Sequence, residues 1–130
     1  MNVLTIRTDK PEAELGLYRD QKQFAYDTWE AHRQLAETIH NHIRELLSSQ
    51  AIDLAALDGI VVFKGPGSFT GLRIGISVAN AFSESLRIPI VGSDGDGWIA
   101  TGLSLIASGT NQQIILPEYG ALPNVSTPKK

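Results

Sequence analysis

The sequence predicts an α/β domain in which three antiparallel strands are followed by parallel strand–helix units. Two patterns predict this class. Apolar and polar residues alternate over residues 3–6, 13–17 and 23–28, which is typical of half-buried strands. Beyond residue 30, segments with helical apolar spacing alternate with short β-branched runs. Strands separated by such helices are expected to be parallel, with right-handed crossovers.

The first half of the chain contains three predicted strands and one helix. A turn over Thr8–Pro11 and a polar hairpin over Arg19–Lys22 separate the strands. Asp27 and Glu30 have the spacing of a capping box and predict a helix over residues 30–49. The apolar face of that helix would consist of Leu35, Ile39, Ile43, Leu46 and Leu47.

The second half repeats strand and helix. The run Gly59–Phe63 predicts a buried strand, and a helix is expected over 69–86. A strand over 88–92, a helix over 95–108 begun by Ser93 and Asp94, and a sixth strand over 113–116 follow. Residues 1–116 are therefore expected to form one domain and 117–130 an exposed tail. The inward face of the second helix would consist of Leu72, Ile76, Ala79, Phe82 and Leu86.

Composition narrows the functional classes. The 130 residues suit one domain, and the net charge of −3 argues against tight autonomous nucleic-acid binding. The absence of cysteine excludes disulfides, thiol catalysis and cysteine metal sites. No apolar run is long enough to span a membrane, and the first residues do not resemble a signal peptide. We expect a cytoplasmic protein without membrane association.

A glycine-rich stretch from Lys64 to Gly75 joins a predicted strand to a predicted helix. One interpretation is a phosphate cradle at the helix N-terminus, formed by Gly65, Gly67, Ser68 and Thr70. The other is a turn whose glycines allow close packing. The stretch matches neither a Walker loop nor a dinucleotide fingerprint, and Pro66 removes one N–H donor from it.

Other polar residues give weaker signals. His32, His40 and His42 do not have the spacing of a zinc set, and the Asp94–Asp96 segment is predicted to form a helix-capping turn rather than a cation site. Arg73 is equally compatible with a phosphate or partner contact and with a solvated surface position. Trp29 and Trp98 are predicted to be core or interface residues. No metal site is expected.

The stretch Gly65–Gly75 is similar to the hallmark of the bacterial TsaB (YeaZ) family. The segment Ile88–Ser93 and His32, ahead of a leucine-containing helix, also resemble that family. The resemblance covers residues 2–116. It implies a ribonuclease H-like, actin-type ATPase half-domain without its own catalysis. It also implies a scaffold role beside TsaD, the catalytic subunit, which with the TsaE ATPase makes threonylcarbamoyladenosine on tRNA.

The resemblance also implies a partner interface on the first two helices. Carried over to this sequence, it would contain His32, Leu35, Ile39, Ile43, Gly71, Leu72, Gly75 and Ala79. The same helices would pair two copies when TsaD is absent. Contact with tRNA would be indirect, through the complex, and ATP or ADP would bind only at a shared interface.

Two departures from the family pattern affect these expectations. Arg7 follows the first strand where actin-type ATPases have an acidic residue that supports the metal–phosphate site. Asp9 is a shifted substitute, but Lys10 adjoins it. The chain also stops near the predicted sixth strand, so it resembles a short form without most of the second domain. The alternative function is a nucleotide-binding, sugar-kinase-type ATPase that uses the Gly65–Gly75 loop.

Overall fold

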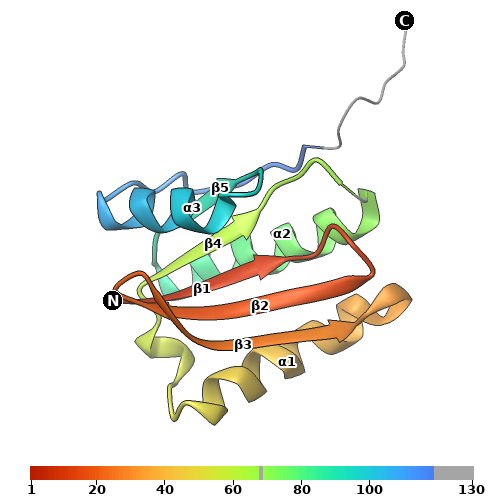
Figure 1. Ribbon diagram of the computed structural model, residues 1–130, viewed down its shortest axis with the longest axis horizontal. Helices are drawn as coiled ribbons and strands as arrows, with labels where there is room; N and C mark the ends of the chain where they lie inside the picture. Colours follow the sequence, from red (N-terminus) through yellow and green to blue (C-terminus); the bar gives the residue numbers. More distant parts are fainter. Residues whose placement is uncertain (68, 119–130) are drawn as a thin grey trace, which may run out of the picture.

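The computed structural model describes residues 1–67 and 69–118, which are built around one mixed five-stranded sheet (Figure 1). The strand order is β3-β2-β1-β4-β5. The strands are β1 (Asn2–Arg7), β2 (Glu12–Arg19), β3 (Lys22–Glu30), β4 (Gly59–Phe63) and β5 (Ile90–Ser93). β1 to β3 are antiparallel, and β4 and β5 continue the sheet parallel to β1. The predicted fold class is confirmed.

Three α-helices cover the two faces of the sheet. They are α1 (Leu35–Ser49), α2 (Phe69–Leu86) and α3 (Trp98–Ala107), with short 3-10 turns at His32–Gln34 and Leu54–Ala56. α1 packs on β2 and β3, α2 on β1 and β4, and α3 on β4 and β5. Val61 of β4 lies against α3, and its neighbour in β1, Thr5, points to the same face of the sheet. Thr8, three residues further along the chain, points to the opposite face and lies against α2. The two helices therefore lie on opposite sides of the sheet (Figure 1).

The core lies between the sheet and these helices. β4 is buried along its whole length, as expected for a central parallel strand. The β2–β3 hairpin turns at Asp20 and Gln21, whose φ angles of 52° and 71° suit a two-residue turn between twisted strands. The largest fully buried side chains are Leu4, Ile6, Leu15, Leu17, Ile39, Ile43, Ile60, Leu72, Ile90, Val61, Val62 and Val91.

Both side-chain caps predicted from the sequence are wrong. Asp27 and Glu30 belong to β3, and α1 begins only at Leu35, so the capping box does not form. The third helix begins at Trp98 without a side-chain cap. Ser93 instead donates its hydroxyl hydrogen bond to the carbonyl of Trp98, at 2.6 Å. Neither Asp27 nor Ser93 therefore accepts a hydrogen bond from a free backbone N–H at the start of a helix.

The predicted sixth strand is also wrong, because residues 113–116 have no strand conformation. The segment nevertheless follows the open edge of β5. The N–H of Gln112 donates to the carbonyl of Ile90 at 2.9 Å, and the side-chain oxygen of Gln112 accepts from the N–H of Gly92 at 2.9 Å. One backbone hydrogen bond and the side-chain amides of Asn111 and Gln112 therefore take the place of a regular ladder. Of the predicted tail, residues 119–130 lie outside the described residues.

Candidate functional site

The glycine-rich stretch packs α2 against the end of β1. The hydroxyl of Thr8, a residue only 1% exposed, donates a 2.7 Å hydrogen bond to the carbonyl of Gly71. A Cβ atom at Gly75 would collide with that hydroxyl. The absence of a side chain at Gly75 therefore allows the helix to lie on the strand. These contacts support the close-packing interpretation.

The glycine-rich turn before α2 packs against other segments of the same chain, near Asp9 and Glu118. A Cβ at Gly67 would lie 2.5 Å from the Cβ of Asp9. Gly65 has a φ of 116° and lies against the backbone of Glu118. The N–H of Glu118 donates to the carbonyl of Lys64 at 2.7 Å, and their side chains form a 3.5 Å ion pair. Among the predicted phosphate-binding residues, Thr70 is exposed and Ser68 lies outside the described residues.

The end of β1 carries an ion pair where the ATPase pattern needs a free carboxylate. Arg7 holds Asp9 in a bidentate contact, Nε to Oδ1 at 2.7 Å and Nη2 to Oδ2 at 3.1 Å. The Asp9 side chain is 7% exposed, and the guanidinium lies 3.9 Å from the centre of the Phe63 ring. The hydrogen bond to Asp9 raises the pKa of Arg7. The Arg7 guanidinium and the Asp9 carboxylate thus neutralise each other in a bidentate ion pair.

The described residues contain no group of three histidine or acidic side chains that could hold a metal ion.

A cluster of side chains joins β3 to α1. Asp27, predicted as a cap, instead forms a 2.7 Å hydrogen bond with His42 Nδ1. The His42 ring stacks on Trp29 at 3.8 Å between ring centres. The Trp29 indole donates to the Thr38 hydroxyl at 3.0 Å. This cluster ties α1 to β3, and sequence spacing gave no signal for it because its members come from different elements.

Most residues predicted for the partner interface are in the domain core. Most of their side chains point inward and are little accessible to a partner while the domain is folded, although Leu35 and Gly71 also line a surface hollow. The interface itself stays a prediction. Gly71 is half-buried, and the side chain of His32 lies outside the part that the structure describes. The buried residues among those predicted are Leu35 (4% exposed), Ile39 (0%), Ile43 (1%), Leu72 (0%), Ala79 (0%) and Gly75.

The outward sides of the same two helices leave a surface groove. We call the interhelical groove the two adjoining hollows, of about 450 and 310 Å³, that share Thr70 and Ile74. The His40 ring closes part of its α1 side and lies 5.7 Å from the Phe82 ring of α2. The remaining lining residues are Thr8, Lys10, Pro11, Ala31, Arg33, Leu35, Ala36, Gly71, Arg73, Ser77 and Val78.

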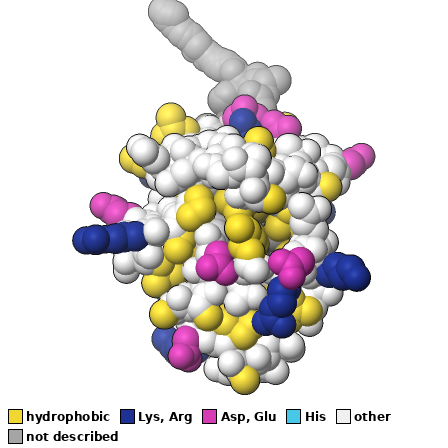
Figure 2. Space-filling model, turned by 90° about the vertical axis from the view of Figure 1, so that its left-hand side faces the viewer, with side chains coloured by type: hydrophobic (Ala, Val, Ile, Leu, Met, Phe, Trp, Pro, Cys, Tyr) yellow, Lys and Arg dark blue, Asp and Glu magenta, His cyan; other side chains and the backbone are white. Residues whose placement is uncertain are grey.

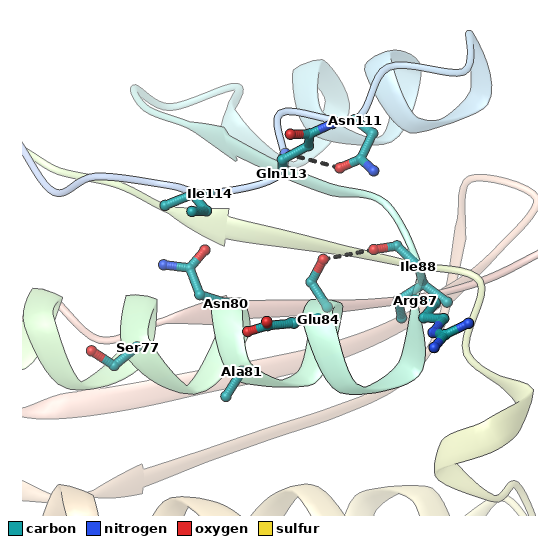
Figure 3. A pocket seen from close by; sticks show the side chains of 10 residues that line it. Ser77, Asn80, Ala81, Glu84, Arg87, Ile88, Asn111, Gln113 and Ile114 are labelled. Carbon is teal, nitrogen blue, oxygen red and sulfur yellow. Dashed lines mark hydrogen bonds between the residues drawn. The ribbon is translucent and has the colours of Figure 1, made fainter.

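A third hollow, of about 700 Å³, lies between the C-terminal half of α2 and residues 111–114 (Figure 3). Its polar side chains mainly hold the chain together. The Asn80 amide donates to the carbonyl of Ile115 at 3.0 Å and accepts from its N–H at 2.9 Å. Ser83 donates to the carbonyl of Ile88 at 2.6 Å, and Asn111 accepts from the N–H of Gln113 at 2.9 Å. These contacts give the hollow a structural explanation.

Acidic and basic side chains are interspersed with hydrophobic ones on the face that Figure 2 shows. This face therefore does not carry the continuous basic field that phosphate-backbone binding requires.

Within residues 1–67 and 69–118, no helix is long and apolar enough to cross a membrane.

The sequence matches a protein-family model, "TsaD: tRNA N6-adenosine threonylcarbamoyltransferase", over residues 29–125. It is 28% identical over 97 residues to the tRNA threonylcarbamoyladenosine biosynthesis protein TsaB of Escherichia coli K12. The chain belongs to the family of this model, and within it to the TsaB (YeaZ) proteins. An uncharacterised protein of Mycobacterium tuberculosis H37Rv is 37% identical over 93 residues.

Solved structures agree with this assignment. YeaZ from Pseudomonas aeruginosa superimposes with a TM-score of 0.67 and 26% identity, covering 72% of this chain and 43% of YeaZ. Thermus thermophilus RuvC, solved with a Holliday junction substrate, has a TM-score of 0.54 at 12% identity, which shows the ribonuclease H-like fold alone. The matches cover 69% of this chain and 44% of the mycobacterial protein, and 71% of this chain and 39% of E. coli TsaB. This TsaB-family chain thus spans less than half of these relatives.

Proposed function

We propose that the chain is a non-catalytic scaffold subunit that binds a TsaD-type catalytic subunit through the outward faces of α1 and α2. The observation that carries the proposal is the interhelical groove. It is open to a partner, and the small side chains of Ala36, Thr70 and Ser77 along it allow another backbone to approach closely. Family membership supports a role in tRNA threonylcarbamoyladenosine biosynthesis.

The strand ends support the non-catalytic part of the proposal. Asp9 is held by Arg7 and lies against Gly67, so its carboxylate is not available to support a metal–phosphate group. Within the part of the chain that the structure describes, no histidine or carboxylate base is hydrogen-bonded to the Thr70 hydroxyl. Isothermal titration with ATP and magnesium tests the alternative. Sub-millimolar binding that is lost in Thr70→Ala would favour a nucleotide-binding enzyme instead.

The same proposal includes the wider assembly. A TsaE-type ATPase would join the complex, tRNA would be contacted through the complex, and two copies would pair through α1 and α2 when the catalytic subunit is absent. Any ATP or ADP would bind at a shared interface, and the complex would act in the cytoplasm. The chain's net charge of −3 supports an indirect rather than an autonomous contact with tRNA.

A matched pair of tryptophan substitutions tests the proposed face. Ser77 is exposed in the groove on α2, whereas Ser104 is exposed on α3, across the sheet. We expect Ser77→Trp to weaken association with a TsaD-type subunit at least about tenfold, because a bulky side chain fills the space that a partner needs. Ser104→Trp should leave it unchanged. Equal binding by both variants would place the interface elsewhere.

A further inference from the structure

We infer that the occupant of the interhelical groove is an acidic amphipathic segment of a protein partner. This inference rests on the proposed function and specifies the chemistry of the partner. The first observation is charge. Lys10 and Arg33 line one end of the groove, where Lys10 also forms a 3.9 Å ion pair with Glu14, and Arg73 lines the other end beside His40. None of the described residues that line it is acidic. A basic groove on a chain with a net charge of −3 indicates local complementarity to negative charge.

The second observation is the composition of the groove floor. Leu35 reaches it from the core at 4% exposure, and Ile74 and Val78 are half-buried and pack against the core. Apolar area at the centre with charge around it is the usual arrangement of a protein interface. An occupant that satisfies both features presents an apolar side chain to the floor and carboxylates to the basic ends. An amphipathic helix does this with residues three and four positions apart.

The same features favour a protein over a nucleic acid. A nucleic-acid surface needs a track of cations along the phosphate backbone, with aromatic side chains where bases stack. The groove has cations at its two ends and an aliphatic floor. The only aromatic ring that lines it among the described residues is the imidazole of His40.

Charge reversal on the groove tests the inference with the intact chain and a TsaD-type subunit. The double variant K10E/R33E reverses two exposed charges at one end of the groove. The control K22E/R87E makes the same change in net charge at exposed positions that lie outside α1 and α2 and line neither hollow of the groove. Isothermal titration at low and high salt gives the dissociation constant of each. Matching urea midpoints establish that all the variants are folded, and R33E alone provides a milder substitution.

We expect K10E/R33E to bind about tenfold more weakly than K22E/R87E at low salt, with a smaller loss of affinity on adding salt. R33E should show part of that effect. Equal dissociation constants for the two double variants would overturn the acidic occupant while leaving the scaffold function intact. No binding by the wild-type chain would overturn both. Binding of tRNA by the chain alone, lost in K10E/R33E, would identify a nucleic acid as the occupant and overturn the inference.

Discussion

The substitution Gly75→Ala should destabilise the domain through a single contact. The new methyl group would collide with the Thr8 hydroxyl, which is 1% exposed and donates to the Gly71 carbonyl at 2.7 Å. Overpacking costs about 1–3 kcal/mol, and a lost buried hydrogen bond about 1–3 kcal/mol. The better helix propensity of alanine offsets about 1 kcal/mol. We expect the free energy of unfolding to fall by about 3 kcal/mol, the middle of the range that these contributions give.

Urea denaturation of a double-mutant cycle measures this contact. Thr8→Ala removes the hydroxyl and should itself cost about 1 kcal/mol. Because it also removes the colliding atom, Thr8→Ala/Gly75→Ala should be more stable than the sum of the single effects, by at least about 1 kcal/mol. Gly97→Ala is the control, since Gly97 has a φ of −92° and nothing lies within 4 Å of its added Cβ. Additive effects, or a Gly75→Ala variant as stable as Gly97→Ala, would refute the reasoning.

Three further predictions test other contacts. Asn80→Ala should speed amide exchange at Ile115 and cost about 1 kcal/mol, because the backbone of that residue loses both amide contacts; unchanged exchange would refute it. His42→Ala should cost about 1 kcal/mol in urea denaturation and alter the fluorescence of the indole stacked on it; an unaltered spectrum would contradict the stacking. Burial, followed by the hydrogen bond to Glu14, raises the pKa of Tyr26 to about 12. Because the folded state holds the Tyr26 proton more tightly than the unfolded state, this group stabilises the fold fully below pH 10, and the stabilisation is lost as the pH rises towards 12. Glu14→Gln should lower the midpoint of Tyr26 ionisation in an ultraviolet titration.

The regular elements were predictable because their signals are local. Strand alternation and helical spacing identified β1 to β5 and α2 with small errors at the ends. The caps were wrong because Asp27 pairs with the His42 side chain and Ser93 donates to the Trp98 carbonyl, and neither side chain accepts a hydrogen bond from the first N–H groups of a helix. The sixth strand was wrong because amide side chains, rather than a backbone ladder, satisfy the edge of β5.

The candidate site was only partly predictable for a related reason. Apolar spacing identifies the inward face of a helix, and the interface prediction chose residues such as Ile39 and Leu72 from that face. A groove depends on which outward residues of α1 and α2 meet, and sequence spacing within one helix does not determine this. The sequence places Arg7 and Asp9 together at the end of the first strand, but it does not predict that they form an ion pair.

Mapping backbone amide shifts while a TsaD-type subunit is added is the most direct test of the central claim, that the outward faces of α1 and α2 bind the partner. The account predicts that the largest changes fall on residues 36–40 and 70–78, which contain most of the groove's lining residues on the two helices. Residues 98–107 of α3, across the sheet, should change little. Changes concentrated on α3, with 36–40 and 70–78 unaffected, would contradict the account.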